Sequence, residues 1–318
     1  MFNYIIGRIF QLIIVVFVVT LVIFILFRVL IPGDPALAML GMDYTKEAYD
    51  NLREEMGLND NLFIQYLKWV ENIFKGDLGN SIIDDVKVLH LILKSVSITF
   101  VIALIAITIS GMLAILISLS TAYYNNSLFD HITRTFTMIG ICMPTEWLSI
   151  IVILFFALYL GLFPAGGYIE IFHGWDSFLY FFLPILVLVS QQVSVLVRFL
   201  RSNVLDVINS DYIRTARSKG LSEFIVLFKH VLRNSIIPFV TLIGLSFAKM
   251  IGGMVIVEKV FNIPGMGRLL IRAISNRDYP VIQGTLLIIA IIYVIINLII
   301  DLSYAWIDPR IRVSNEEK

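Results

Sequence analysis

Charge is scarce in this sequence, and the little that is present is balanced. Only 15% of the 318 residues are Asp, Glu, Lys or Arg, with 24 acids against 24 bases, whereas 58% are apolar. Soluble domains carry about 25% charged residues, so the composition excludes an ordinary soluble globule and a disordered chain. Nucleic-acid binding needs a basic surface, which a neutral chain does not supply. The composition therefore predicts a membrane protein.

Residues that carry common chemistries are also missing. The single cysteine, Cys142, excludes a disulfide framework and a cysteine-based zinc site. The sequence contains no GxxxxGK[ST] phosphate loop, no HExxH zinc helix and no GxSxG nucleophile motif. The four histidines are scattered without ligand spacing: His90, His131, His173 and His230. No catalytic or metal-binding residue is expected, which disfavours an enzyme and leaves a transporter or a channel.

Long apolar runs are abundant, and six of them reach the roughly 20 residues that a spanning helix needs. These runs predict an all-α, polytopic fold with spans Ile9–Ile31, Val96–Leu119, Thr135–Leu160, Phe178–Val197, Ser235–Val257 and Val281–Leu302. The first run is longer than a secretory signal core, so we interpret it as an uncleaved anchor. The chain then divides into 1–31, a soluble loop 32–95, and a core transmembrane region 96–318.

The basic residues of the short loops indicate the orientation. With the N-terminus inside, twelve Lys and Arg lie on the inner side, seven of them in loop 198–234, against four in the outer loop 258–280. This asymmetry predicts that both termini are cytoplasmic. Loop 32–95 is then extracytoplasmic, and it is long enough to be translocated across the membrane regardless of its charge.

The outer loop 32–95 contains two predicted helices. Thr45 is placed to cap Lys46–Met56, which Gly57 closes, and Asp60 is placed to cap Asn61–Lys75, which Gly76 closes. Apolar residues of the second helix recur at helical spacing. This stripe either packs on the helix bundle or forms a docking surface for an outside protein, and spacing alone favours packing.

The inner loop 198–234 is too long for a simple connection. It predicts a helix over Val204–Lys219, a break at Gly220 and a second helix over Leu221–Leu232. The second helix has one apolar face, formed by Leu221, Phe224, Ile225, Phe228, Val231 and Leu232. That face must be buried against the bundle, a lipid surface or a groove on a cytoplasmic partner.

Two charged residues fall inside predicted spans, Glu146 in the third and Lys249 in the fifth. An unpaired charge at the bilayer centre costs at least about 2.5–3.5 kcal/mol. One hypothesis is that both line a central pathway, as a pair or as contacts for a zwitterionic substrate. The other is that Lys249 extends toward the interface, while Glu146 bonds backbone freed by Pro144.

One stretch of the inner loop resembles a known family. Residues 212–238, YIRTARSKGLSEFIVLFKHVLRNSIIP, are similar to the cytoplasmic coupling motif of binding-protein-dependent ABC importer permeases, which reads Glu-Ala-Ala, three residues, Gly, nine residues, Ile-x-Leu-Pro. Ala216, Gly220 and Leu232 match that motif, whereas its Glu and closing Pro have no counterpart here. The same departures are usual in the peptide branch of the family.

Further stretches resemble that branch in the same order along the chain. They are PGDPA at 32–36, GLNDNLFIQYLKWVENIFKGDLGNS at 57–81, FNIPGMGRLLIRAISNRDYPVIQG at 261–284 and DPRIR at 308–312. Together they are similar to the oligopeptide, dipeptide and nickel permease group. The long outer loop after the first span is similar to that of the first of its two permease subunits.

The resemblance implies a division of labour in the bacterial cytoplasmic membrane. Two permeases form the pathway, two ABC ATPase subunits bind ATP and Mg²⁺ at the cytoplasmic face, and an extracytoplasmic binding lipoprotein delivers the ligand. This chain would bind no cofactor and no nucleic acid. Its contact with an ATPase subunit would involve Arg214, Thr215, Ala216, Arg217, Gly220, Leu221, Ser222, Glu223 and Phe224.

The substrate remains open within this group. The resemblance favours oligopeptides or dipeptides, with nickel, a metal chelate or a glutathione-like ligand as the alternatives. A stand-alone secondary transporter or channel is an alternative of a different class. Such a protein is expected to have internal repeats and broken helices in matching halves, and no convincing repeat is present.

Overall fold

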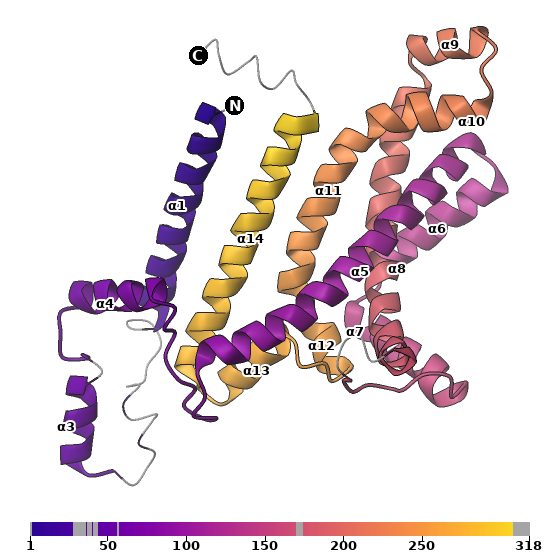
Figure 1. The fold of residues 1–318 in the computed structure, drawn as a ribbon. Coiled ribbons are helices and arrows are strands. Elements are labelled where there is room, and N and C mark those ends of the chain that lie inside the picture. Colours follow the sequence, from indigo (N-terminus) through magenta and orange to yellow (C-terminus); the bar gives the residue numbers. More distant parts are fainter. Residues whose placement is uncertain are drawn as a thin grey trace. The chain divides into compact units, whose positions relative to one another are not determined.

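The computed structural model describes residues 2–27, 44–55, 57–169 and 174–307, together with Ala36 and Leu40. Within these residues every regular element is a helix, as predicted (Figure 1). The PGDPA motif, apart from its Ala36, and the DPRIR motif lie outside the described residues. The helices are α1 (Phe2–Ile25), α3 (Lys46–Glu55), α4 (Leu62–Phe74), α5 (Val88–Tyr123), α6 (Leu128–Cys142), α7 (Thr145–Val152), η2 (Ile153–Tyr159), α8 (Trp175–Ile208), α9 (Asp211–Ser218), α10 (Glu223–Ile225), η3 (Val226–Val231), α11 (Leu232–Gly253), α12 (Val255–Val260), α13 (Met266–Ser275) and α14 (Tyr279–Ile307).

Four stretches of helix are long and apolar enough to cross a membrane. They are Val88–Tyr123, Trp175–Ile208, Glu223–Gly253 and Tyr279–Leu302. They contain the predicted second, fourth and sixth spans in full and most of the fifth. The predicted first span coincides with α1, whose apolar part runs over Phe10–Ile25, and its last residues lie outside the described ones. The chain is therefore a polytopic, all-helical membrane protein.

The predicted third span, Thr135–Leu160, is not one straight helix. It is divided into α6 and the α7–η2 segment, and the two parts are bent by 108°. The physical cause is Pro144, because a proline disfavours helical backbone in the residue before it and lacks an N–H group. Met143 accordingly takes an extended conformation, with ψ 122°.

A side chain of α8 supports this bend. Gln191 donates a hydrogen bond from Nε2 to the carbonyl oxygen of Met143, at 3.3 Å, and Nε2 lies 3.0 Å from Thr145 Oγ1. Backbone polar groups at membrane depth need such partners, because lipid offers none. The amide of Gln191 therefore replaces part of the hydrogen bonding that the break removes.

Both helices predicted in the outer loop are present, with one difference in capping. Thr45 Oγ1 accepts from the N–H of Ala48 at 3.3 Å, and both Gly57 and Gly76 have positive φ, as expected of helix-closing glycines. Asn61, rather than Asp60, caps α4 by accepting from the N–H of Phe63 at 3.2 Å. The Asp60 carboxylate instead binds Lys68 Nζ at 2.6 Å.

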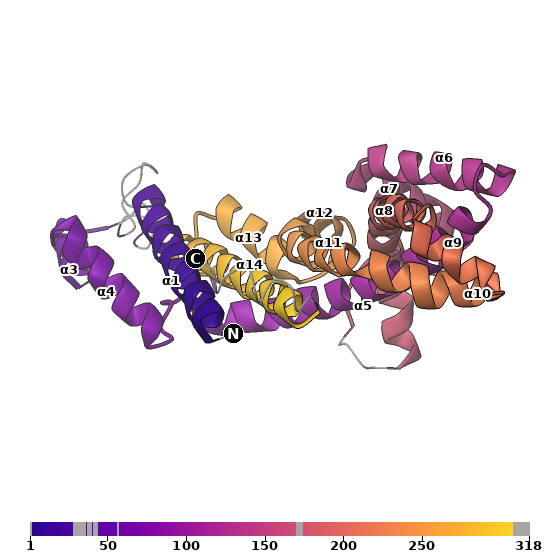
Figure 2. The same ribbon diagram turned by 90° about the horizontal axis from the view of Figure 1, so that it is seen from above.

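The described residues form two compact units. The first comprises Phe100–Ile263 and the end of α14 from Ile296, and the second comprises residues 2–99, as far as described, and Pro264–Ile295. In the first unit α6 and α11 pack on α8, and α6 and α8 lie side by side in both views (Figures 1 and 2). A Cβ at Gly140 would clash with Ser194 Oγ, so α6 approaches α8 closely at this glycine.

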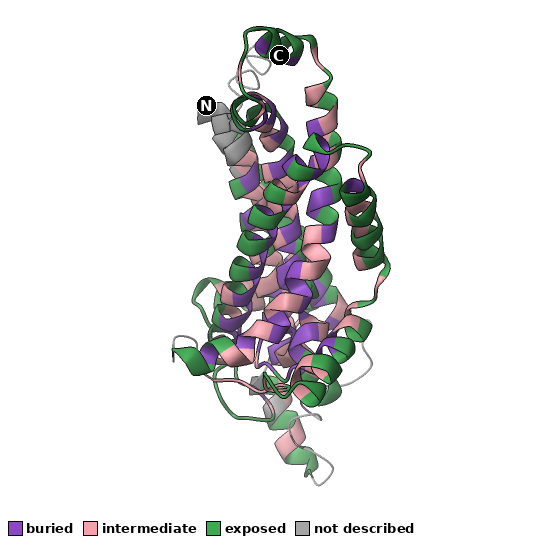
Figure 3. Cartoon of the chain, turned by 90° about the vertical axis from the view of Figure 1, so that its right-hand side faces the viewer, coloured by how far each residue is buried: buried purple, intermediate pink, exposed green. Residues whose placement is uncertain are grey.

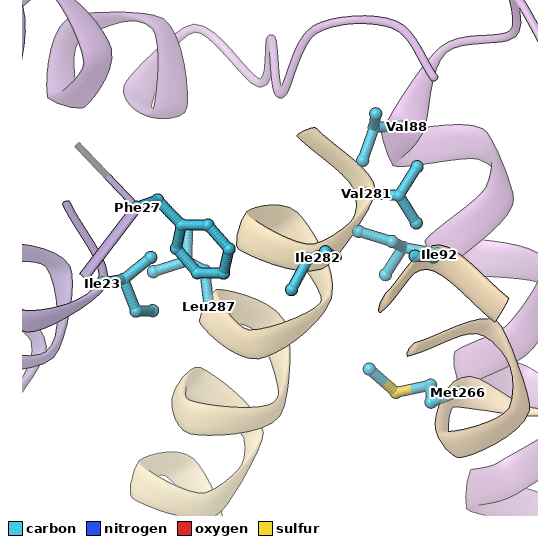
Figure 4. Close-up of a cluster of buried hydrophobic side chains, with 9 residues drawn as sticks. Ile23, Phe27, Val88, Ile92, Met266, Val281, Ile282 and Leu287 are labelled. Atoms are coloured by element: carbon cyan, nitrogen blue, oxygen red, sulfur yellow. The ribbon is translucent and has the colours of Figure 1, made fainter. Parts of the chain in front are cut away.

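The second unit has an apolar core of its own. Figure 4 shows Ile23 and Phe27 beside Leu287 of α14, with Val88 and Ile92 of α5 near the start of the same helix. Met266 and Ala273 of α13 complete this cluster. A short extramembrane segment is fixed to the same unit, because Ser81 Oγ donates to Asp278 Oδ2 at 2.5 Å.

Candidate functional site

The inner loop forms a short helix that stands apart from the spans on either side. The predicted helix Val204–Lys219 is in fact two helices, because α8 ends at Ile208 and α9 begins at Asp211. Asn209 and Ser210 cause the break: Asn209 Nδ2 donates to the carbonyl oxygen of Leu205 at 2.9 Å, and Ser210 is extended with ψ 152°. Asn and Ser favour such local bonds over helix continuation.

Gly220 ends α9 in the predicted manner. Its φ is +76°, the left-handed conformation that glycine adopts at the C-terminal end of a helix. Its N–H donates to the carbonyl oxygen of Arg217 at 2.9 Å. No atom lies within 4 Å of the position that a Cβ would occupy. Backbone conformation, and not lack of space, is therefore what requires glycine here.

The second predicted helix of the loop, Leu221–Leu232, is not a separate element. After Leu221 and Ser222 the chain enters one helical stretch, Glu223–Gly253, that continues directly into the span (Figure 1). Its apolar face is also distributed differently from the prediction. Val226, Leu227 and Val231 are buried, whereas Phe224, Ile225 and Phe228 are exposed.

Side-chain bonds join α9 to the start of this long helix. Arg217 and Glu223, on either side of Gly220, form a two-point ion pair, with Nε–Oε1 at 2.7 Å and Nη2–Oε2 at 3.2 Å. Tyr212 OH accepts from Asn234 Nδ2 at 2.6 Å. Ile213 and Ala216 form the buried face of α9. The hairpin of α9 and α10–η3 is thus tied at both of its ends.

The opposite face of this hairpin is open. The side chain of Arg214 is 82% exposed, and the ring of Phe224 is 69% exposed and lies 4.5 Å from that of Phe228. Helix α9 carries exposed residues beside the buried Ile213 and Ala216, and Figure 3 colours the chain by this burial. Of the predicted contact residues, Ala216 is buried, Leu221 and Glu223 are half-buried, and the other six are exposed. The six exposed residues lie on one short hairpin, and they include two arginines, Arg214 and Arg217, and one aromatic residue, Phe224.

Glu146 and Lys249 lie in the first unit, in the first turn of α7 and in α11. Both side chains are exposed in the single chain. Among the described residues no salt bridge joins them, so the structure does not pair them with each other. Glu146 follows Pro144 at the N-terminal end of α7, where a carboxylate is favoured by the helix dipole.

A buried carboxylate that the sequence analysis missed lies at the other end of α6. Asp130 is fully buried and accepts from Nε and Nη2 of Arg201, both at 2.8 Å, and from Arg134. The N–H of Asn126 donates to the same carboxylate at 3.1 Å. The partners come from α6, α8 and the loop between α5 and α6. The i, i+4 spacing of Asp130 and Arg134 was the only signal in the sequence.

Among the described residues, no three His, Cys, Asp or Glu side chains are grouped so as to hold a metal ion. Cys142 is a free thiol. His173 lies outside the described residues. The arrangement presents an exposed hairpin face with Arg214 and Phe224, and exposed charges at Glu146 and Lys249 on apolar helices.

The chain matches known sequences over nearly its whole length. Residues 114–313 match the family described as binding-protein-dependent transport system inner membrane component, and residues 1–103 match the N-terminal family of such membrane components. A probable peptide ABC transporter permease protein, y4tP of Sinorhizobium fredii, is 40% identical, over 97% of this chain and 99% of its own length.

Two other relatives and one solved structure are similar. The oligopeptide transport system permease protein AppB of Bacillus subtilis is 39% identical over 88% of this chain and 90% of its own. The glutathione transport system permease protein GsiC of Escherichia coli is 36% identical over 98% of this chain and 99% of its own length. The crystal structure of an amino acid ABC transporter with histidines has a similar fold, with TM-score 0.52 and 14% identity over 68% of this chain and 93% of that one.

Proposed function

Because the chain belongs to the family of binding-protein-dependent transport system inner membrane components, we propose that it is a permease subunit of an ATP-driven peptide importer. The observation that carries this proposal is the full-length similarity to permeases named for peptide and glutathione transport, at 36–40% identity. The chain itself is a non-catalytic subunit, and ATP with Mg²⁺ is bound by partner subunits.

We infer six spans with both termini in the cytoplasm of a bacterium. The four long apolar helices, the bent α6–α7 pair and α1 together provide this number, and the excess of basic residues on the inner side supports the orientation. A second, homologous permease completes the pathway. An extracytoplasmic lipoprotein delivers the ligand to loop 32–95 and its neighbours.

The hairpin of α9 and α10–η3 is the proposed contact with an ATPase subunit. Arg214, Arg217 and Phe224 lie on its open face, and a groove on the ATPase would cover them. Binding of ATP favours one of two states of the assembly, so the groove moves when the ATPase subunits close. Because α9 follows α8 and is tied to the long helix Glu223–Gly253, its displacement moves two spans together.

We propose that Glu146 and Lys249 line the pathway. Both charges are exposed on single apolar helices, and a charge that faces lipid is costly. A water-filled passage between two permeases removes that cost. A ligand with one amino and one carboxylate group would then meet a charge of each sign, which favours a peptide over the alternatives, nickel or a metal chelate.

Reconstitution tests this function. The chain, its partner permease and the two ATPase subunits are placed in vesicles with the cognate binding protein and a radiolabelled dipeptide or oligopeptide. We expect uptake that requires ATP and the binding protein. Uptake by this chain alone, without nucleotide, would instead identify a secondary transporter, and uptake of nickel but not of peptide would reassign the substrate.

A further inference from the structure

Helix α4 has three faces of different character. At about 100° per residue, its side chains fall into a buried stripe, an exposed apolar stripe and a charged stripe. The buried stripe carries Tyr66, which is buried, and Trp69 and Ile73, which are half-buried; the exposed apolar stripe carries Phe63, Leu67 and Phe74; and the charged stripe carries Lys68, Glu71 and Lys75. Phe63, Leu67 and Phe74 are 67%, 50% and 87% exposed. A soluble helix seldom leaves such large side chains open to water.

The buried stripe packs on the apolar part of α1. Tyr66 OH lies 2.9 Å from Thr20 Oγ1, and the Tyr66 ring lies 5.4 Å from the Phe24 ring and 6.3 Å from the Phe17 ring. All three α1 residues belong to the first span, Ile9–Ile31. Figure 1 shows α4 crossing α1 rather than continuing it.

The surroundings of α1 at this level identify what the exposed stripe meets. The α1 residues Val18, Val22 and Ile25 are apolar and 48%, 57% and 40% exposed. In a spanning helix such residues contact acyl chains, and α4 is anchored to the same turns. Every charged side chain of the third stripe forms a salt bridge. Lys75 pairs with Glu71 of the same stripe, and Lys68 pairs with Asp60, which precedes the helix; both N–O distances are 2.6 Å.

We propose that α4 is an interfacial helix whose stripe of Phe63, Leu67 and Phe74 is inserted into the outer leaflet of the bilayer. Amphipathic helices of this kind bury their apolar face about 5–10 Å into the boundary between headgroups and acyl chains. Tyr66 extends from α4 toward Thr20, and Lys68, Glu71 and Lys75 remain among headgroups and water. The proposal rests on the proposed first span, since α1 sets the depth of α4.

The test measures lipid contact directly in the assembled transporter. In a Cys142→Ser background, single variants Leu67→Cys and Phe74→Cys are labelled with nitrobenzoxadiazole, and the complex is placed in lipid nanodiscs. The matched controls are Lys68→Cys and Lys75→Cys, each one residue along the helix. Lipids with a nitroxide on the upper part of the acyl chain should quench the emission at 67 and 74 more strongly than at 68 and 75, and iodide should give the reverse.

Two results would overturn the proposal. Quenching at 67 and 74 by iodide but not by nitroxide lipid would place the stripe in water, open to the binding protein. No quenching by either agent would mean that a protein partner covers it. Peptide uptake is measured on the same preparations. Uptake without quenching by lipid would refute only the interfacial helix, and quenching by lipid without uptake would refute only the proposed function.

Discussion

Gly220 is the residue whose backbone conformation constrains the proposed coupling hairpin most closely. Its φ of +76° is open to glycine, tolerated by asparagine and costly for other residues, by about 1–2 kcal/mol. Since the space around it is empty, the effect of a substitution follows from φ alone. A graded series of variants therefore separates conformation from bulk.

We expect Gly220→Asn to retain most ATP-driven uptake, Gly220→Ala to lose part of it, and Gly220→Pro to lose it. Proline fixes φ near −65° and removes the N–H that bonds Arg217. Uptake and ATP hydrolysis are measured in parallel, because hydrolysis without uptake indicates uncoupling. Normal uptake by Gly220→Pro would count against the role assigned to the hairpin.

Asp130 is a second residue with a large expected effect, on stability rather than on coupling. Asp130→Asn leaves Arg134 and Arg201 without their carboxylate, and breaking a buried ion pair costs about 3–5 kcal/mol. We expect lower thermal stability of the purified chain in detergent, partly recovered when Arg201→Gln is added. The control is Asp211→Asn, whose side chain is 96% exposed and 3.9 Å from Arg214. Equal melting of Asp130→Asn and Asp211→Asn would refute the expectation.

At the scale of elements, the apolar runs predicted the existence of the membrane helices but not their breaks. Pro144 was visible in the sequence, yet prolines occur inside spanning helices when neighbours satisfy the freed backbone, so the 108° bend required tertiary information. The break between α8 and α9 depends on Asn209 and Ser210, two polar residues that only weakly disfavour the interior of a helix. The carboxylate of Asp130 binds Arg201, 71 positions away, which no local pattern indicates.

The sequence also could not predict which residues of the α10–η3 helix are buried. Its apolar residues are spread around the helix, and packing within the fold, where α8 and α9 both contact η3, leaves Val226 and Leu227 buried while Phe224 and Phe228 are exposed. Of the apolar face that periodicity predicted, Val231 is buried within the chain, whereas Phe224, Ile225 and Phe228 are exposed in the single chain. The exposed aromatic pair is consequently a feature that the structure supplied.

We expect Phe224→Ala to weaken binding of the ATPase subunit while leaving the melting of the isolated chain unchanged. The ring is exposed in the single chain, and truncation of a central interface aromatic costs about 2 kcal/mol or more. Affinity is measured by pull-down titration. The matched control is Leu227→Ala, a buried residue whose truncation should lower stability by about 2–5 kcal/mol. A lower melting temperature for Phe224→Ala would contradict an interface role.

At the scale of the whole molecule, the proposed function makes this chain one half of a passage that is driven by ATP bound to other subunits. In this proposal, the exposed face of the hairpin and the exposed charges of Glu146 and Lys249 are covered by other subunits. The family and the class of transporter could be predicted from several motifs in one order. The substrate could not, because selectivity in this arrangement also depends on the binding protein, which is another chain.

We expect Glu146→Gln to reduce uptake of zwitterionic peptides severalfold in the full assembly, with ATP hydrolysis retained. The exposed carboxylate has no ion-pair partner among the described residues, so its loss should leave the melting temperature unchanged. Lys249→Met provides the companion variant with the opposite charge removed. Unchanged uptake by both the Glu146→Gln and the Lys249→Met variants would refute the proposal that these residues line the pathway.

Because of the break at Pro144, the residue that is acceptable at position 144 depends on the residue at position 191, and the reverse, as the sequence evolves. If Pro144 alone became a helix former, α6 and α7 would tend to join, and the Gln191 amide would lose the carbonyl that it now binds. If Gln191 alone became leucine, the carbonyl of Met143 would be left without its donor in an apolar layer. Each single step is therefore unfavourable, so we expect substitutions at Pro144 and Gln191 to accompany each other.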